Sequence, residues 1–251
     1  MVCEVKIIEE PDLRDPVLVE GLPGIGLIAN MAVAFLIKKL EAKKFGEVIS
    51  TAFPDISVVE KEGIVKPPFC HLYYYRGNRP RERDLILLYG NTQALTRRGQ
   101  YELCSSILDV SEKLGCKYVI TLGGYRPGKR VEKPNLYYAA SDLNTAKTAK
   151  SLGAEVLNGQ IYGVAGLLIG LAALRGMQGF CLLAETSGDR LDVDGAREVL
   201  RAISGILGLD VDLEELKDSE DLADFLTPFD FGVLAKERMK KLSRPRPNWF
   251  V

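Results

Sequence analysis

Four near-continuous apolar runs constrain the fold of this chain most strongly. Each is followed by glycine or by a polar loop, and helical patterns alternate with them. Runs of this kind suit strands that are covered on both faces, as in a parallel sheet. The sequence therefore predicts an α/β fold, a three-layer α/β/α sandwich on a mixed sheet. The runs occupy residues 17–20, 84–89, 118–122 and 180–184.

Helical spacing of apolar residues fills most of the sequence between these runs. Residues 50–75 look extended, with breaks at Pro54 and Pro67, and predict an antiparallel hairpin. Residues 161–174 are apolar but short of the roughly twenty that a membrane span needs, so we expect a buried helix. The predicted helices are residues 27–40, 100–114, 144–152, 161–174 and 194–205.

The sequence pattern changes near residue 211, and this change divides the chain. We expect an α/β/α core over residues 1–211, because strand and helix signals alternate throughout it. Residues 212–242 are acidic at first and basic at their end, which predicts a C-terminal helical segment. Residues 243–251 contain two prolines and no helical pattern, which predicts a flexible tail.

Charge and composition exclude several classes of function. The 33 basic and 34 acidic residues nearly cancel, so we expect no partner among nucleic acids or membranes. No two of the five cysteines lie within four positions, which argues against a cysteine metal site and favours a reducing cytoplasm. The single histidine, His71, lies in a strand-like run and is expected to be structural. We expect no cofactor and no metal.

A glycine-rich turn follows the first apolar run. It occupies residues 21–26 and includes Gly24, between a strand pattern and a helix pattern. Such a turn can present backbone N–H groups to a phosphate. Its spacing is GxxGxG, however, and the dinucleotide fingerprint is GxGxxG. The sequence therefore favours a tight turn with close helix–sheet packing over a nucleotide site.

Polar residues follow two other predicted strands, at the edge where open α/β sheets place their ligands. Gly124 and Arg126 come after residues 118–122, and Glu185 and Asp189 come after residues 180–184. The arginines could hold an anion, and the two carboxylates could form a pair or bind magnesium. Solvated loop side chains are the competing interpretation. The candidate ligand crevice comprises Gly24, Arg98, Gly124, Arg126 and Glu185.

The chain ends on Trp249, Phe250 and Val251. Exposed aromatic residues on a flexible end add nothing to a core unless they fold back or bind a partner. Aromatic anchors contribute much of the energy of interfaces, and a terminal carboxylate can be captured by a lysine or by backbone N–H groups. The residues alone leave two interpretations open: a docking tail, or a tail packed on its own subunit or a neighbour.

Several segments resemble the archaeal branch of the proteasome assembly chaperone family. They are residues 17–40, Phe53-Pro54-Asp55, LYGNTQ at 88–93, ITLGGY at 120–125 and NGQIYGVAGLLIGLA at 158–172. The pattern NGxIxGxxGLL is the most specific, and the resemblance covers about residues 15–225. It implies a fold similar to that of nucleoside phosphorylases and a homo-oligomer, with a trimer to a pentamer expected. No ATP-grasp signature accompanies it.

The resemblance also implies a function. Family members with chaperone activity insert a C-terminal hydrophobic residue, a tyrosine and any final residue into pockets between proteasome α-subunits, where the terminal carboxylate meets a lysine. Trp249, Phe250 and Val251 match these positions, with Phe250 lacking the tyrosine hydroxyl. We therefore expect a non-enzymatic, ATP-independent, cytoplasmic assembly chaperone or adaptor that docks on the α-ring. The alternative is an enzyme or binding protein for a phosphorylated or nucleoside-like ligand in the crevice.

Overall fold

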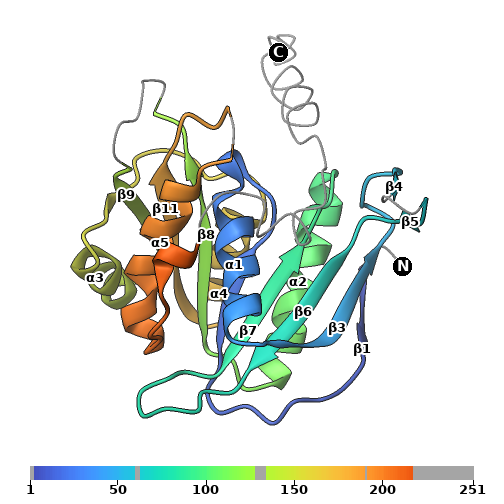
Figure 1. Ribbon diagram of the computed structural model, residues 1–251, viewed down its shortest axis with the longest axis horizontal. Coiled ribbons are helices and arrows are strands. Elements are labelled where there is room, and N and C mark those ends of the chain that lie inside the picture. The colour runs from blue at the N-terminus through green and yellow to red at the C-terminus, as the bar shows by residue number, and fades with distance from the viewer. Residues whose placement is uncertain (1–2, 60–62, 128–133, 190, 217–251) are drawn as a thin grey trace, which may run out of the picture.

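The computed structural model describes residues 3–59, 63–127, 134–189 and 191–216 (Figure 1). In these ranges a nine-stranded mixed sheet has the order β1-β3-β6-β7-β2-β8-β11-β9-β10. The four apolar runs form its centre, where neighbouring strands are all parallel. The predicted α/β fold on a mixed sheet is confirmed. The central strands are β7 (Leu85–Gly90), β2 (Val17–Gly21), β8 (Tyr118–Tyr125) and β11 (Gln178–Glu185).

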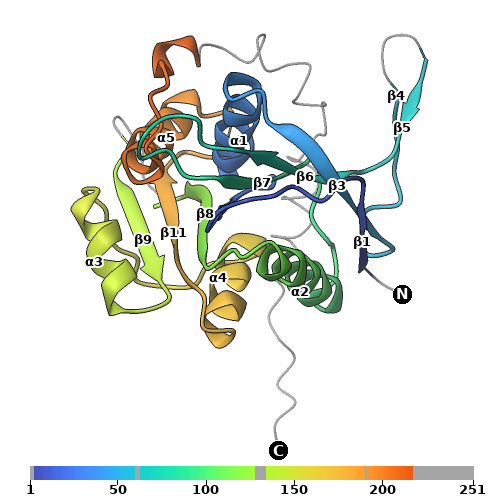
Figure 2. The same cartoon turned by 90° about the horizontal axis from the view of Figure 1, so that it is seen from below.

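Outer strands extend the sheet on both sides, and all their pairs are antiparallel except the parallel pair of β9 and β10. On one side the outer strands are β6 (Cys70–Tyr75), β3 (Lys43–Ser50) and β1 (Cys3–Ile7). On the other side β9 (Leu136–Ala140) pairs antiparallel with β11, and β10 (Glu155–Val156) pairs with β9. A small hairpin projects beyond β3 (Figures 1 and 2). Its two strands are β4 (Val58–Val59) and β5 (Val65–Lys66).

Helices cover both faces of the sheet (Figure 2). On one face lie α1 (Ile28–Lys39) and α5 (Val193–Leu207), which pack against each other. On the opposite face α2 (Arg97–Lys113) and α4 (Val164–Leu174) lie side by side. Helix α3 (Leu143–Ser151) lies beside β9. Two short 3-10 turns complete the described chain, η1 (Ile25–Leu27) before α1 and η2 (Leu213–Glu215) after α5.

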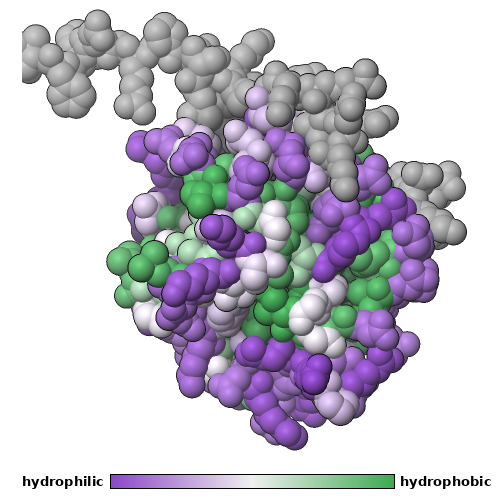
Figure 3. Space-filling model, turned by 90° about the vertical axis from the view of Figure 1, so that its left-hand side faces the viewer, coloured by the Kyte–Doolittle hydropathy of each residue, from purple (hydrophilic) through white to green (hydrophobic). Residues whose placement is uncertain are grey.

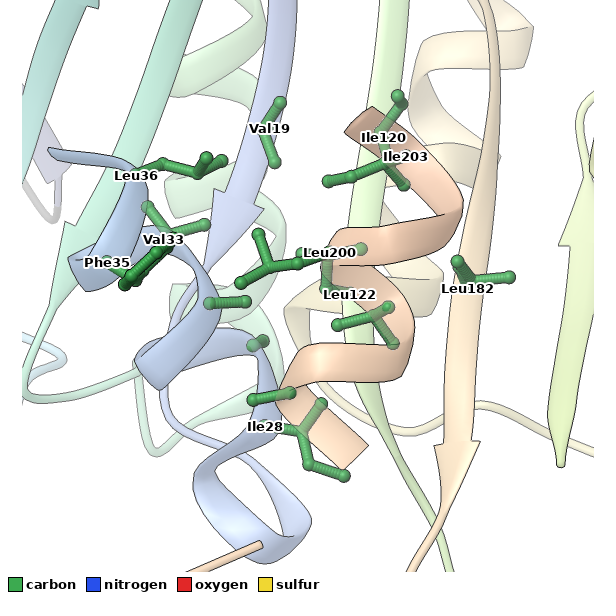
Figure 4. Packing of buried hydrophobic residues seen from close by; sticks show 14 of the residues in the cluster. Val19, Ile28, Val33, Phe35, Leu36, Ile120, Leu122, Leu182, Leu200 and Ile203 are labelled. Atoms are coloured by element: carbon green, nitrogen blue, oxygen red, sulfur yellow. The ribbon is translucent and has the colours of Figure 1, made fainter. Parts of the chain in front are cut away.

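The sheet separates two apolar cores because successive side chains of a strand point to opposite faces. In β2, Val17 and Val19 face the core under α1 and α5, whereas Leu18 faces the core under α2 and α4. Figure 4 shows the first core, where Val33 of α1 and Leu200 of α5 meet above the sheet. All these side chains are fully buried. Burial of each stabilises the fold by about 1.5–3 kcal/mol relative to an exposed side chain.

One expectation from the sequence is wrong. Residues 161–174 were expected to form a buried helix, but α4, which packs on the sheet and on α2, leaves Gly170 and Leu174 exposed. Val164, Leu168 and Ala172 are buried, whereas Leu174 is 84% exposed. The helix is apolar on all sides, so its hydropathy alone does not distinguish the covered face from the open one.

The packed core continues beyond residue 211. Asp212 caps η2 by accepting a hydrogen bond from the backbone N–H of Glu214, and Leu216 is buried in the core under α1 and α5. Arg197 of α5 donates to the Leu216 carbonyl at 2.6 Å. The remainder of the predicted helical segment and the predicted tail, residues 217–251, lie outside the described residues. Within the described ranges, no helix has the length and apolar character needed to cross a membrane.

The contact between α1 and β2 depends on the absence of a side chain at Gly21. A Cβ atom placed there would lie 2.3 Å from Val33 Cβ. We expect Gly21→Ala to lower the free energy of unfolding by about 1–3 kcal/mol, because helix and strand would have to move apart. Gly24→Ala is the matched control, since a Cβ there meets nothing within 4 Å. Urea unfolding checks this, and equal midpoints for the two variants would contradict it.

Candidate functional site at the carboxyl edge of the sheet

The glycine-rich turn connects β2 to α1 and is held at both ends. Asn30 of α1 donates its side-chain amide to the carbonyls of Gly21 and Gly90, at 3.0 and 2.8 Å. These carbonyls stand where β2 and β7 end. Gly26 has a φ of +67°, a conformation that favours glycine. The predicted tight turn with close helix–sheet packing is confirmed.

The turn also packs against the end of β8. A Cβ atom at Gly124 would lie 2.3 Å from the carbonyl oxygen of Ile25. One at Gly26 would lie 3.0 Å from Thr186 Oγ1, just after β11. Three segments are therefore close together at this edge: the glycine-rich turn, the end of β8 and the residues after β11. Gly24 is the neighbour of Ile25, which approaches Gly124, but the space around Gly24 itself is open.

Arg126 lies at the same edge and already has one anionic partner and one carbonyl partner. Its guanidinium forms an ion pair with Asp189 and donates to the carbonyl of Ser187. Gly188, between these two residues, has a φ of +70° and would place a Cβ 2.6 Å from Ile25. Arg126 thus holds the loop after β11 against the glycine-rich turn.

Glu185 ends β11 as predicted and is buried. Its carboxylate accepts hydrogen bonds from Asn135 Nδ2 at 2.7 Å and from the Tyr137 hydroxyl at 3.0 Å. This bond to the carboxylate is the main reason that the pKa of Tyr137 is raised. Glu185 and Asp189 have separate partners, and among the described residues no group of three or more metal-binding side chains gathers.

Arg98 lies apart from these contacts. It is on the first turn of α2, its side chain is 80% exposed, and it pairs with Glu102 one turn along the same helix. An exposed ion pair at this spacing contributes only about 0.3–0.5 kcal/mol. The structure thus gathers Gly24, Gly124, Arg126 and Glu185 at one edge and places Arg98 on a solvent-exposed helix surface.

The half-buried side-chain amide of Gln93 connects the turn to both helices on the far face. Gln93 Nε2 donates to the Pro23 carbonyl at 2.6 Å, and Gln93 Oε1 accepts from the backbone N–H of Val164 at 3.2 Å. The Gln100 side chain of α2 also donates to Gln93 Oε1, at 3.3 Å. The first turn of α4 is held to the sheet by Thr121, which donates to the Ala165 carbonyl. Gln93 therefore serves as the cap that α4 lacks at Gly163.

Glu20 was missed by the sequence analysis. It lies on β2 beside Thr121 of β8 and is 1% exposed. One carboxyl oxygen accepts from the backbone N–H of Leu22 at 2.8 Å, while the other has no hydrogen-bond partner. Burial raises the pKa of Glu20 to about 8, against the lowering effect of backbone hydrogen bonds from Leu22 and Leu122. An acidic residue within an otherwise apolar strand was the available signal.

His71 has the structural environment expected of it. Its ring stacks on Phe69 with centroids 4.7 Å apart, in the middle of β6. Burial lowers the pKa of His71 to about 4, so the imidazole is neutral at pH 7.

An open hollow of about 370 Å³ lies at the opposite edge of the sheet. Its charged side chains pair with one another: Arg79 with Glu82 and Asp210, and Lys39 with Glu215. Tyr75 donates to Glu82 at 2.8 Å, and burial raises the pKa of this tyrosine to about 12. These pairs join the loop after β6 to the segment after α5.

The predicted docking residues, Trp249, Phe250 and Val251, lie outside the described residues.

The chain belongs to the PAC2 family, which residues 18–224 match. The resemblance seen in the sequence is confirmed. The chain is 32% identical to an uncharacterised protein of Methanocaldococcus jannaschii over 97% of its own length and 92% of the relative.

Solved structures with the same fold include two from Pyrococcus furiosus. One is PbaB, described as an archaeal proteasome activator, with a TM-score of 0.80, 32% identity and coverage of 97% of this chain and 99% of PbaB. The other is PbaA, described as an archaeal homologue of proteasome-assembly chaperone, with a TM-score of 0.72, 27% identity and coverage of 96% and 100%. A Mycobacterium tuberculosis proteasome-assembly chaperone homologue, 21% identical over 92% of this chain and 96% of its own with a TM-score of 0.63, shares the fold.

The pKa of Glu20 predicts a pH-dependent stability. In the unfolded chain the Glu20 carboxyl group loses its proton at its ordinary pKa of about 4.5. In the folded chain it loses the proton only at about pH 8. Stability should therefore fall between these pH values, by about 1.4 kcal/mol per pH unit from this group. We expect Glu20→Gln to flatten that slope in urea unfolding measured from pH 5 to 8. Glu4→Gln, on the exposed surface of β1, is the control, and identical slopes for the wild type and Glu20→Gln would refute the assignment.

Proposed function

We propose that this protein is a non-enzymatic, ATP-independent proteasome assembly chaperone or adaptor of the cytoplasm. The observation that carries the proposal is the match to PbaB along almost the whole of both chains, at 32% identity. The match to PbaA, over a similar share of this chain, supports the same class of function. In this proposal the partners are proteasome α-subunits and further copies of the chain.

The docking element in this proposal is the C-terminal tail. Trp249 and Phe250 supply two aromatic anchors, and Val251 supplies the terminal carboxylate. A tail of about eight residues reaches at most roughly 25–30 Å. A three-residue anchor binds weakly on its own, and linking several tails in one oligomer raises avidity about 10²–10⁴-fold when their spacing matches the ring.

The carboxyl edge supports a structural role for its polar residues. Arg126 is engaged by Asp189, Glu185 by Asn135 and Tyr137, and Gln93 by two backbone segments. The proposed function requires no cofactor.

The alternative, a binding protein for a phosphorylated or nucleoside-like ligand, is favoured by one observation. Glu20 keeps a buried carboxyl oxygen without a hydrogen-bond partner, and it directly precedes the glycine-rich turn at residues 21–26. Thermal melting with a panel of nucleosides, nucleotides and inorganic phosphate tests it. A ligand at 100 times its Kd should stabilise the fold by about 2.7 kcal/mol. An unchanged Tm across the panel would reject this alternative.

The tail can be tested by adding the hydroxyl that it lacks. We expect Phe250→Tyr to tighten binding to archaeal proteasome α-rings roughly 2–10-fold, since one hydrogen bond contributes about 0.5–1.5 kcal/mol. Deletion of residues 249–251 should abolish that binding. Surface plasmon resonance with immobilised α-rings measures both effects.

The oligomer mass of each tail variant is the control, since neither change should alter it. Binding that persists at full strength after deletion of residues 249–251 would defeat the docking role of the tail. Loss of binding together with loss of the oligomer would instead assign these residues to subunit contacts.

A further inference from the structure

The motif NGxIxGxxGLL at residues 158–168 begins with an Asn-Gly pair that the proposed function does not use. Asn158-Gly159 is the single Asn-Gly pair in the sequence. An asparagine that precedes a glycine is chemically reactive, because no Cβ atom shields the main-chain nitrogen that follows it. Whether such a pair reacts in a folded protein depends on its exposure and on the hydrogen bonds of that nitrogen.

The fold leaves this pair on the surface. Both residues are exposed, in a stretch without helix or strand that runs from residue 157 to residue 163. The stretch follows β10, which is the outermost strand at its end of the sheet. Figure 3 looks onto the end of the molecule that carries α3 and β9, where hydrophilic side chains cover much of the surface between apolar patches. Water therefore reaches Asn158 freely.

The backbone of Gly159 leaves its nitrogen open to reaction. Its φ is +146°, a conformation that residues with a Cβ atom rarely adopt, so the fold itself favours glycine here. A Cβ atom built at this position would meet nothing within 4 Å. Among the described residues, the N–H of Gly159 donates to no main-chain carbonyl. The nitrogen beside Asn158 is thus neither shielded by a side chain nor held by the main chain.

Two related pairs show the opposite arrangement. Asn144 is also exposed, but the next nitrogen, that of Thr145, donates to Asp142 Oδ1 at 3.0 Å in the capping box of α3. In Asp194-Gly195, at the start of α5, the glycine nitrogen donates to Asp192 Oδ1 at 2.8 Å. In both pairs the nitrogen that would have to react is already engaged.

We propose that Asn158 is a site of spontaneous deamidation in the folded protein. The Gly159 nitrogen loses its proton and attacks Cγ of Asn158, so that a new C–N bond forms and the bond from Cγ to Nδ2 breaks. The side-chain nitrogen leaves as ammonia, and a succinimide ring remains. Water then opens this ring at either of its carbonyls, which gives aspartate or isoaspartate at residue 158.

Both products change the segment that leads into α4. Either one adds a negative charge to a chain whose formal net charge is −1. Isoaspartate also lengthens the main chain by a methylene group, between two anchored positions. On one side the N–H of Leu157 donates to the Tyr138 carbonyl at 2.9 Å. On the other side Ile161 packs on Gly166 of α4, where an added Cβ atom would lie 2.7 Å from the Ile161 Cβ.

Peptide mapping of the full-length protein by mass spectrometry is the first test. One sample is incubated in its native state and another in guanidinium chloride, each at neutral and at alkaline pH. We expect native Asn158 to deamidate within roughly tenfold of its rate in the unfolded chain, because exposed loops open at almost no cost in free energy. The rate should rise at alkaline pH, since the attacking nitrogen must lose its proton. Asn144 is the internal control, and folding should slow its deamidation far more.

Asn158→Gln is the matched variant, because the substitution is on the surface and a glutamine side chain forms the corresponding ring much more slowly. Isoelectric focusing of aged protein should show an acidic species for the wild type that is absent or strongly reduced in this variant. Methylation by an isoaspartyl-specific methyltransferase with S-adenosylmethionine should label the aged wild type, since opening of the succinimide ring produces isoaspartate.

Three outcomes would overturn the proposal. A native rate at Asn158 that lies further than roughly tenfold below the unfolded rate would show that the fold protects the pair. Aspartate at residue 158 without isoaspartate would exclude the route through the Gly159 nitrogen. An acidic species of equal amount in Asn158→Gln would place the modification at another residue. None of these measurements needs a proteasome subunit, so they stand apart from the test of α-ring docking.

Discussion

The side-chain amide of Asn30 holds together the part of the fold on which the rest depends. It donates to the ends of two adjacent parallel strands at once, through the carbonyls of Gly21 and Gly90. Both residues are buried at strand ends, where a carbonyl left without a partner costs about 1–3 kcal/mol. The bonds also fix where α1 starts relative to the sheet. Since α5 packs on α1, the layer on that face takes its position from this one amide.

The side-chain amide of Gln93 has the same role on the face of the sheet that α2 and α4 cover. Gln93 joins the glycine-rich turn to the starts of α2 and α4, so the turn is fastened from both sides of the sheet. Around it, charged side chains are paired within the chain, as Arg126 is with Asp189. At the carboxyl edge, where many α/β proteins leave a crevice, the Ile25 carbonyl packs closely against Gly124.

The sequence predicted the features that depend on local pattern. The four central strands were evident because each is a continuous apolar run, and the five main helices because their apolar residues recur at helical spacing. Strand β1 was not found, since alternating residues such as Glu4 and Lys6 leave it weakly apolar. The two-residue β10 is held by pairing with β9 alone. The role of Glu20 depends on which helices cover β2, and the open side of α4 depends on what lies beside it. Both are facts of tertiary packing, which local pattern does not encode.

The two ends of the described sheet have a consequence for how copies of this protein meet. An exposed strand edge offers unpaired N–H and C=O groups that can recruit another chain without limit. Here one end is β10, which is two residues long and contains Glu155, and the other is β1, which bears Glu4 and Lys6. Short length and charge both discourage strand addition. The sheet is thereby protected from open-ended growth into fibres, and any contact between copies of the chain would have to use other surfaces, whose geometry can close into a finite ring or pair.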